Sequence, residues 1–111
     1  MAEEAERIAL RNLRGWLDEL EMNAADWETL HPVTQYAFVV EWHDQFLADV
    51  EDLVRAYREG RLTTGERRVF EQNMNRLASL KDKALAIDLA WPEWLDEFLT
   101  GYLQQAAAAG D

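Results

Sequence analysis

The sequence predicts an all-α protein, either a small four-helix bundle or a three-helix core with a short C-terminal helix. Apolar residues recur at spacings of three and four over long stretches, the period of one helical face, and glycine and proline separate these stretches. No alternating run or Asn-Gly turn typical of strand hairpins occurs. With 111 residues, 49% of them apolar, and no internal duplication, we expect a single domain spanning residues 1–111.

The first helix is predicted over about residues 3–22. Its apolar stripe consists of Leu10, Leu13, Trp16, Leu17 and Leu20. Residues 23–32 then break the period, because Asp26 can cap one short turn and Pro32 disfavours helical geometry at the residue before it. We therefore expect the chain to reverse here.

A long second helix is predicted over about residues 33–59. With a turn of 100° per residue, one broad face contains Tyr36, Val39, Val40, His43, Phe46, Leu47, Val50, Leu53, Val54 and Tyr57. The opposite face contains Glu41, Asp44, Asp49, Glu51, Asp52, Arg55 and Glu59. Gly60 has the position of a helix-ending glycine, and Thr63 and Glu66 have capping-box spacing. The second and third helices should therefore form an antiparallel hairpin.

The third helix is predicted over about residues 65–90 and the fourth over 92–105. The inner face of the third contains Val69, Phe70, Leu77, Leu80, Ala84 and Ile87. Trp91 and Pro92 separate the two helices, because proline lacks an amide proton but suits the first turn of a helix. The fourth presents Trp94, Leu95, Phe98, Leu99, Tyr102 and Leu103 over a wide arc. We expect its alanine-rich tail, residues 106–111, to fray.

The charge balance argues against nucleic acid and anionic membranes as direct partners. The net charge is −11, which repels phosphate groups. Residues 1–59 contain 14 acids and 5 bases, net −9, whereas residues 60–111 contain 8 acids and 6 bases, net −2. The apolar runs are short, the N-terminus is acidic where a secretory signal would be basic, and cysteine is absent. We expect a cytoplasmic protein.

No group of residues predicts catalysis. Glu28 and His31 have the Glu-x-x-His spacing of di-iron bundles, but such a site needs this motif on two helices and two further carboxylates. The sequence has one copy, beside Pro32, which favours a solvated glutamate and a turn histidine. Glu41 and His43 are two residues apart on a helix and point away from each other. We expect no catalytic residue, no metal and no cofactor.

Two polar residues stand within the predicted inner faces, His43 on the second helix and Asn73 on the third. A buried asparagine needs a hydrogen-bond partner. Either the two side chains form a polar pair in the core, or Asn73 is exposed because the bundle is looser than the periodicity indicates. We favour the core pair, with His43 mostly neutral.

Three arginines, Arg7, Arg11 and Arg14, recur at helical spacing along one flank of the first helix. Such a stripe could hold a carboxylate or a phosphate. However, Glu3 precedes Arg7 by four residues and Asp18 follows Arg14 by four, so intrahelical ion pairs of about 0.3 kcal/mol each account for much of the pattern. The sequence favours this paired arrangement over an anion site.

Apolar residues beyond the predicted core faces indicate an interaction surface. Phe38 and Trp42 lie at or outside the edge of the second helix's inner face, and the fourth predicted helix is apolar over nearly half its circumference. Exposed aromatic residues mark protein interfaces, and a homodimer is the commonest way of burying them. Alternatively, Trp27, Trp91 and Trp94 fold over these positions from the connections.

We therefore expect a non-catalytic interaction module, an assembly subunit, adaptor or regulator, that binds another protein and itself. The expected partner surface consists of Phe38, Trp42, Trp94, Glu41, Asp49 and Asp52. One alternative is an inhibitor whose carboxylates imitate nucleic-acid phosphates, by analogy in size and charge with small acidic phage proteins directed at nucleases or CRISPR complexes. Another is a bundle that binds a metal or a small molecule through His43, His31 and nearby carboxylates.

Overall fold

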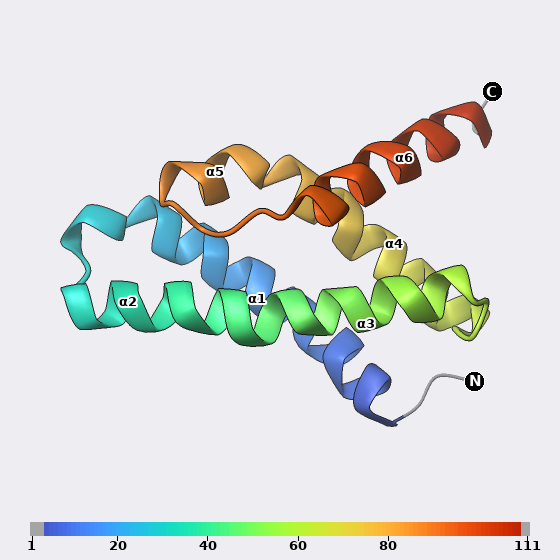
Figure 1. Ribbon diagram of the computed structural model, residues 1–111, viewed down its shortest axis with the longest axis horizontal. Coiled ribbons are helices and arrows are strands. Elements are labelled where there is room, and N and C mark those ends of the chain that lie inside the picture. The colour runs from blue at the N-terminus through green and yellow to red at the C-terminus, as the bar shows by residue number, and fades with distance from the viewer. Residues whose placement is uncertain (1–3, 110–111) are drawn as a thin grey trace.

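The fold is all-α in a computed structural model that describes the backbone of residues 4–109 and the side chains of residues 4–102 (Figure 1). In chain order the elements are α1 (Glu4–Ala25), the 3₁₀ turn η1 (Trp27–Thr29), α2 (Pro32–Glu41), the π-helical segment η2 (Trp42–Phe46), α3 (Leu47–Arg58), α4 (Thr64–Ser79), α5 (Lys81–Ala86) and α6 (Glu93–Ala109). No strand occurs among residues 4–109. The predicted helical bundle is confirmed.

Helix α1 lies at the centre of the bundle and contacts α3, α4 and α5. The segments α2, η2 and α3 form one long rod that crosses α1, and α4 turns back after α3 (Figure 1). Helix α6 contacts α4, and its C-terminal end extends away from the other helices (Figure 1). The shortest dimension of the molecule is 21 Å, about two helix diameters, so the bundle is two layers thick.

The first helix has the predicted inner stripe, since Leu13, Leu17 and Leu20 are fully buried. It ends at Ala25 instead of about residue 22, and its predicted first residue, Glu3, lies outside the described residues. A buried carboxylate joins its start to the turn after α3: Nη1 of Arg61 lies 2.6 and 2.9 Å from the two carboxylate oxygens of Glu6. The hydrogen bond to Glu6, more than the one to Glu59, raises the pKa of the Arg61 guanidinium. This ion pair fixes where the long rod ends against α1.

The long second helix differs from its predicted phase. Phe38 and Trp42, expected at an exposed edge, are 3% and 0% exposed, whereas Tyr36 is 72% exposed. His43, expected on the inner face, is exposed as well and bonds to its neighbour Asp44. The cause is η2: a π-helical turn contains an extra residue, so the inner faces before and after it differ from those of a uniform α-helix. The prediction of an exposed Phe38 and Trp42 is therefore wrong.

The third predicted helix, 65–90, is interrupted at Leu80 and ends at Ala86. Its start is as expected, with a capping box formed by Thr63 and Glu66. Residues 87–92 form a non-helical connection in which Asp88 adopts a left-handed conformation, with φ at 59°. The indole of Trp42 donates a 2.8 Å hydrogen bond to the carbonyl of Ala90. This hydrogen bond holds residues 87–92 over the rod in a non-helical conformation, and the local sequence does not reveal it.

The fourth helix starts at Glu93, close to the predicted residue 92, and continues to Ala109 instead of ending near 105. The predicted frayed tail is thus helical over residues 106–109, while residues 110 and 111 lie outside the described part. Leu95, Phe98 and Leu99 are buried against the bundle. Trp94 is half-buried.

Candidate functional site

A groove runs between the rod and the segment formed by the connection and α6. Its first hollow, of about 400 Å³, is lined by His43, Leu47, Ala48, Glu51, Ala90, Trp91, Pro92 and Trp94. The second, of about 490 Å³, is lined by Glu51, Val54, Arg55, Arg58, Glu59, Trp94 and Glu97. Because Glu51 and Trp94 line both hollows, the two form one continuous groove, which we call the α3–α6 groove.

The connection forms the upper wall of the groove and is pinned at two points. One is the hydrogen bond from Trp42 to Ala90. The other is Asp96, one carboxylate oxygen of which accepts a 2.6 Å hydrogen bond from the Lys81 ammonium and a 3.2 Å hydrogen bond from the Trp91 indole. These two bonds, that of Lys81 above all, hold the pKa of Asp96 below its usual value. The wall is therefore held in place before any partner binds.

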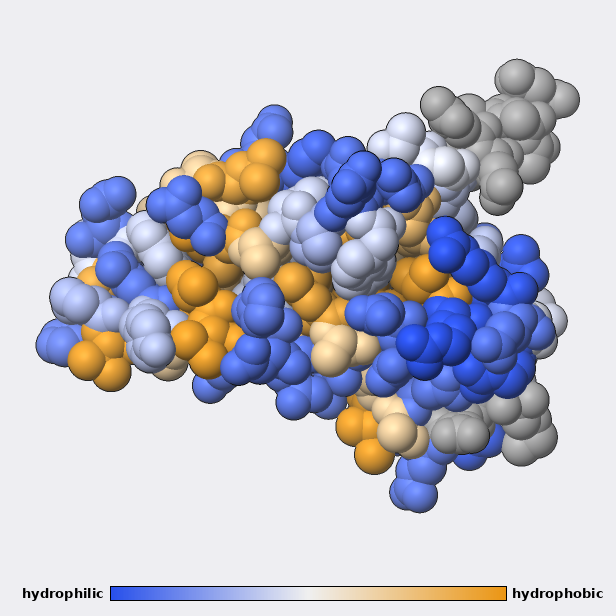
Figure 2. Space-filling model, in the orientation of Figure 1, coloured by the Kyte–Doolittle hydropathy of each residue, from blue (hydrophilic) through white to orange (hydrophobic). Residues whose placement is uncertain are grey.

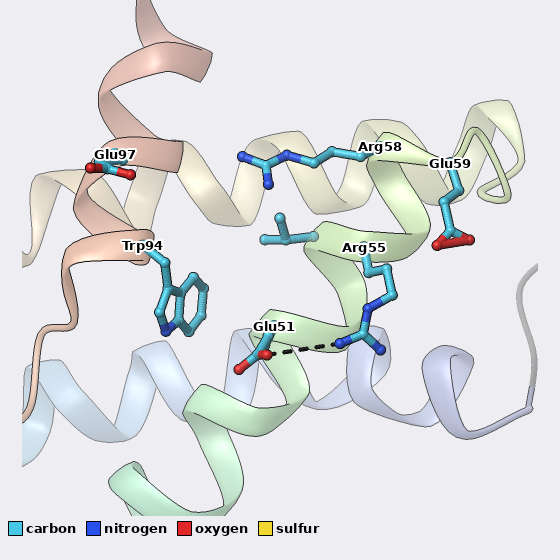
Figure 3. Close-up of a pocket in the computed structure, with 7 residues that line it drawn as sticks. Glu51, Arg55, Arg58, Glu59, Trp94 and Glu97 are labelled. Atoms are coloured by element: carbon cyan, nitrogen blue, oxygen red, sulfur yellow. Dashed lines mark ion pairs between the residues drawn. The ribbon is translucent and has the colours of Figure 1, made fainter.

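The second hollow has an apolar floor and a charged rim. The buried Val54 lines it together with Trp94 of α6 and the arginines of α3. Arg58 reaches toward α6, where its guanidinium carbon lies 5.4 Å from the ring centre of Phe98 (Figure 3). Arg55 instead turns to Glu51, at 3.8 Å (Figure 3). Arg55 also pairs with Asp52, at 3.6 Å, and Glu59 pairs with Arg61, at 2.8 Å. The lining has three glutamates against two arginines, so the rim has a net charge of about −1 and is acidic.

An exposed apolar stripe on α2 continues the groove along the rod. Val33 and Tyr36 are 67% and 72% exposed, and Val40 is half-buried. Val33, Tyr36 and Val40 recur at spacings of three and four, so helical geometry within α2 places them on one side of that helix, and the groove begins further along the rod, at His43. Figure 2 shows apolar side chains over α2 and along the middle of the same face, between hydrophilic residues. We call Val33, Tyr36 and Val40 the α2 stripe.

The predicted acidic site residues do not line the groove. Glu41 and Asp52 are exposed elsewhere on the rod, and Asp49 accepts a hydrogen bond from Gln45. The carboxylates that do line it are Glu51, Glu59 and Glu97. Two of these lie on the predicted acidic face, but Glu97 comes from α6, and only the path of the connection brings it there.

The aromatic part of the predicted site is divided by the structure. Phe38 and Trp42 are inside the core, packed with Trp16, Trp27 and Phe46. Trp94 alone of the three predicted aromatic residues stands at the groove. Trp27 covers Phe38 from η1, with ring centres 6.3 Å apart, and the connection covers Trp42. The alternative in which the connections fold over these positions is therefore the observed one.

The predicted polar pair does not form. Asn73 donates to the carbonyl of Val69 on its own helix, at 2.9 Å, and His43 bonds to Asp44. His31 caps α2, its Nδ1 accepting a hydrogen bond from the amide of Val33. Within residues 4–102, no three histidine or acidic side chains gather closely enough to hold a metal ion.

Comparisons with known protein families, with curated proteins and with solved structures give no match. None of the described helices is both long and apolar enough to cross a membrane. The geometry of the chain itself is thus the basis for any statement about its function.

Proposed function

We propose that the protein is a non-catalytic interaction module whose working surface is the α3–α6 groove together with the α2 stripe. The observation that carries this proposal is the exposure of Val33 and Tyr36 on α2, together with the groove further along the same rod, which Leu47 and Val54 line. Apolar side chains grouped on one face and rimmed by polar residues are typical of protein interfaces.

The chemistry of the rim selects the partner. The second hollow is lined by three glutamates, Glu51, Glu59 and Glu97, against Arg55 and Arg58. Glu51 and Glu59 pair with Arg55 and Arg61, whereas Glu97 makes no ion pair with a described residue. A complementary partner segment therefore carries apolar anchors spaced along a helix and lysine or arginine beside them. The net charge of −11 attracts such a segment at long range.

This surface favours a different protein over a second copy of the chain. Phe38 and Trp42, which argued for a homodimer, are already covered. A two-fold contact through the groove would bring glutamates against glutamates, which is unfavourable. Pure imitation of nucleic acid needs carboxylates in array, whereas this surface combines them with apolar side chains, so its binding depends on both.

Fluorescence anisotropy with two labelled amphipathic peptides tests the proposal. One peptide repeats leucine and lysine at helical spacing, and the other has glutamate in place of lysine. We expect the lysine peptide to bind, the glutamate peptide not to bind, and the variant Val33→Ser with Tyr36→Ser to bind the lysine peptide at least tenfold more weakly. The control variant, Met22→Ser with Leu85→Ser, removes two exposed apolar side chains from α1 and α5 and should bind as the parent does.

Equal binding by both variants would contradict the proposed surface, and equal binding of both peptides would contradict its charge selectivity. Light scattering of the protein alone at low and high salt addresses self-association. A salt-resistant dimer that the Val33→Ser, Tyr36→Ser variant dissociates would assign the face to a second copy instead.

A further inference from the structure

A separate hollow, which we call the arginine hollow, lies on the flank of the bundle between α1 and α4. Three arginines line it: Arg11 and Arg14 from α1 and Arg76 from α4. Leu10 and the 42% exposed Val69 supply apolar surface, and the hollow has a volume of about 450 Å³. The chain has a net charge of −11, so three guanidinium groups around one hollow are unusual for its surface. The proposed function does not involve them.

The intrahelical pair expected between Arg14 and Asp18 does not form. Asp18, predicted to pair with Arg14, lies 2.7 Å from Nη2 of Arg76 instead. Arg7 points across to Glu66 on α4, at 3.7 Å. Its predicted partner, Glu3, lies outside the described residues. Arg11 and Arg14 make no ion pair with any described residue. Their charge is therefore available to a ligand.

Arg76 is held in place for such a role. Its guanidinium binds Asp18 and also Glu21, at 3.0 Å, and these two carboxylates raise its pKa, Asp18 most. Three guanidinium groups beside two carboxylates leave about one unit of positive charge, which suits a single negative charge better than a polyanion. The exposed Val69 suits an apolar group attached to it.

We propose that this arginine hollow binds a monoanionic carboxylate carried on an apolar body. Arg11 and Arg14 hold the carboxylate through charge-assisted hydrogen bonds, and Leu10 and Val69 pack against the apolar part. Two sources share this chemistry, a small free carboxylic acid and the acidic side chain of a partner's apolar segment. Phosphates and nucleic acids are disfavoured by Asp18, Glu21 and the net charge.

NMR titration at low salt, following the arginine Nε–Hε signals, tests this site with defined probes. We expect hexanoate to shift the Arg11 and Arg14 signals saturably and to bind at least fivefold more tightly than acetate or inorganic phosphate. In Arg11→Gln with Arg14→Gln, hexanoate binding should weaken at least tenfold. The control, Arg68→Gln with Lys83→Gln, makes the same charge change at two exposed positions outside the hollow and should leave binding unchanged.

A capped peptide, acetyl-Leu-Leu-Glu-Leu-Leu-amide, distinguishes the two sources. Tighter binding of the peptide than of hexanoate assigns the hollow to an acidic segment of a protein, and the reverse order assigns it to a small acid. Tighter binding of phosphate, equal loss of hexanoate binding in both double variants, or no saturation with hexanoate and peptide would each overturn the proposal. The result is independent of the α3–α6 groove, since neither variant changes a residue that lines it.

Discussion

The two halves of the long rod, α2 and α3, obey the same helical rules but were not equally predictable. On α3 the residues that uniform helical geometry places inside, such as Val50 and Leu53, are fully buried. On α2 the same geometry selects Tyr36 and Val40, and the structure instead buries Phe38, with Trp42 at the start of η2. The difference teaches that a hydrophobic period fixes a helix's inner face only up to the next irregularity in its winding.

The irregularity is the π segment η2, and its effect can be expressed as an angle. Phe38 and Val50 are twelve residues apart, so a uniform α-helix would separate their side chains by about 120°. Removing one residue between them reduces this angle to about 20°. The extra residue in the π turn has the same effect, because each residue there advances by a smaller angle. Both residues therefore reach one core.

Deletions in the rod provide the largest expected effect. Deleting the exposed Asp44 within η2 should convert the π turn to α-helix and keep Phe38 and Val50 on the same side, so the protein should still fold cooperatively. Deleting Asp52 within α3, which is also exposed, should turn the part of the rod before it by about 100° relative to the part after it, and we expect loss of the cooperative transition. Circular dichroism during urea unfolding measures both.

The two deletions remove the same residue type and the same charge from one rod, so each is the control for the other. If both variants unfolded alike, the π segment would not be what aligns the two halves. Retained helicity with a cooperative transition in the Asp44 deletion, together with its loss in the Asp52 deletion, is the expected outcome.

A pair of substitutions on the rod tests the inner face itself. Trp42→Ala should reduce the free energy of unfolding by about 3–5 kcal/mol, because it removes a fully buried ring and the hydrogen bond to Ala90. Tyr36→Ala, which removes an exposed ring from α2, should change it by less than about 0.5 kcal/mol. Urea titration followed by circular dichroism gives both values. A larger loss of stability in Tyr36→Ala than in Trp42→Ala would mean that the inner face of the rod follows uniform helical geometry after all.

Most of the fold is determined by local rules. The inner stripe of α1, the helix-ending Gly60 with φ at 72°, and the capping box at Thr63 depend on residues within a few positions of one another, so the sequence predicts them. The end of α5 is not determined locally, because the hydrogen bond from Trp42 to Ala90 joins residues 48 positions apart. Helical periodicity alone predicts that this helix continues through residues 87–90, whereas α5 ends at Ala86.

The candidate sites depend more on such long-range contacts. Trp94 could be chosen from its apolar surroundings, but Glu97 reaches the groove only through the path of the connection. Asp18 could be matched to Arg14 by spacing, yet Arg76, 58 positions away, takes its carboxylate. In both cases a residue from a distant helix changes which charges remain available on the surface.

The smallest expected effect is on the pH dependence of stability, through Asp96, which helps to hold the connection over Trp42. Because Lys81 and then Trp91 lower the pKa of this carboxyl in the folded state, its contribution to stability is present above the usual aspartate pKa of about 3.9 and is lost as pH falls through the lowered value. Asp96→Asn should therefore be less stable than the parent at pH 7, and the difference should shrink as pH falls below the usual aspartate pKa. The control, Asp82→Asn, makes the same charge change on α5 at a residue that has no ion pair to a described residue. Urea midpoints of the three proteins at pH 7, 5 and 3 therefore separate the effect of the Asp96 contacts from the effect of net charge. A pH-independent deficit in Asp96→Asn would mean that the packing of its side chain, and not its charge, holds the connection over the rod.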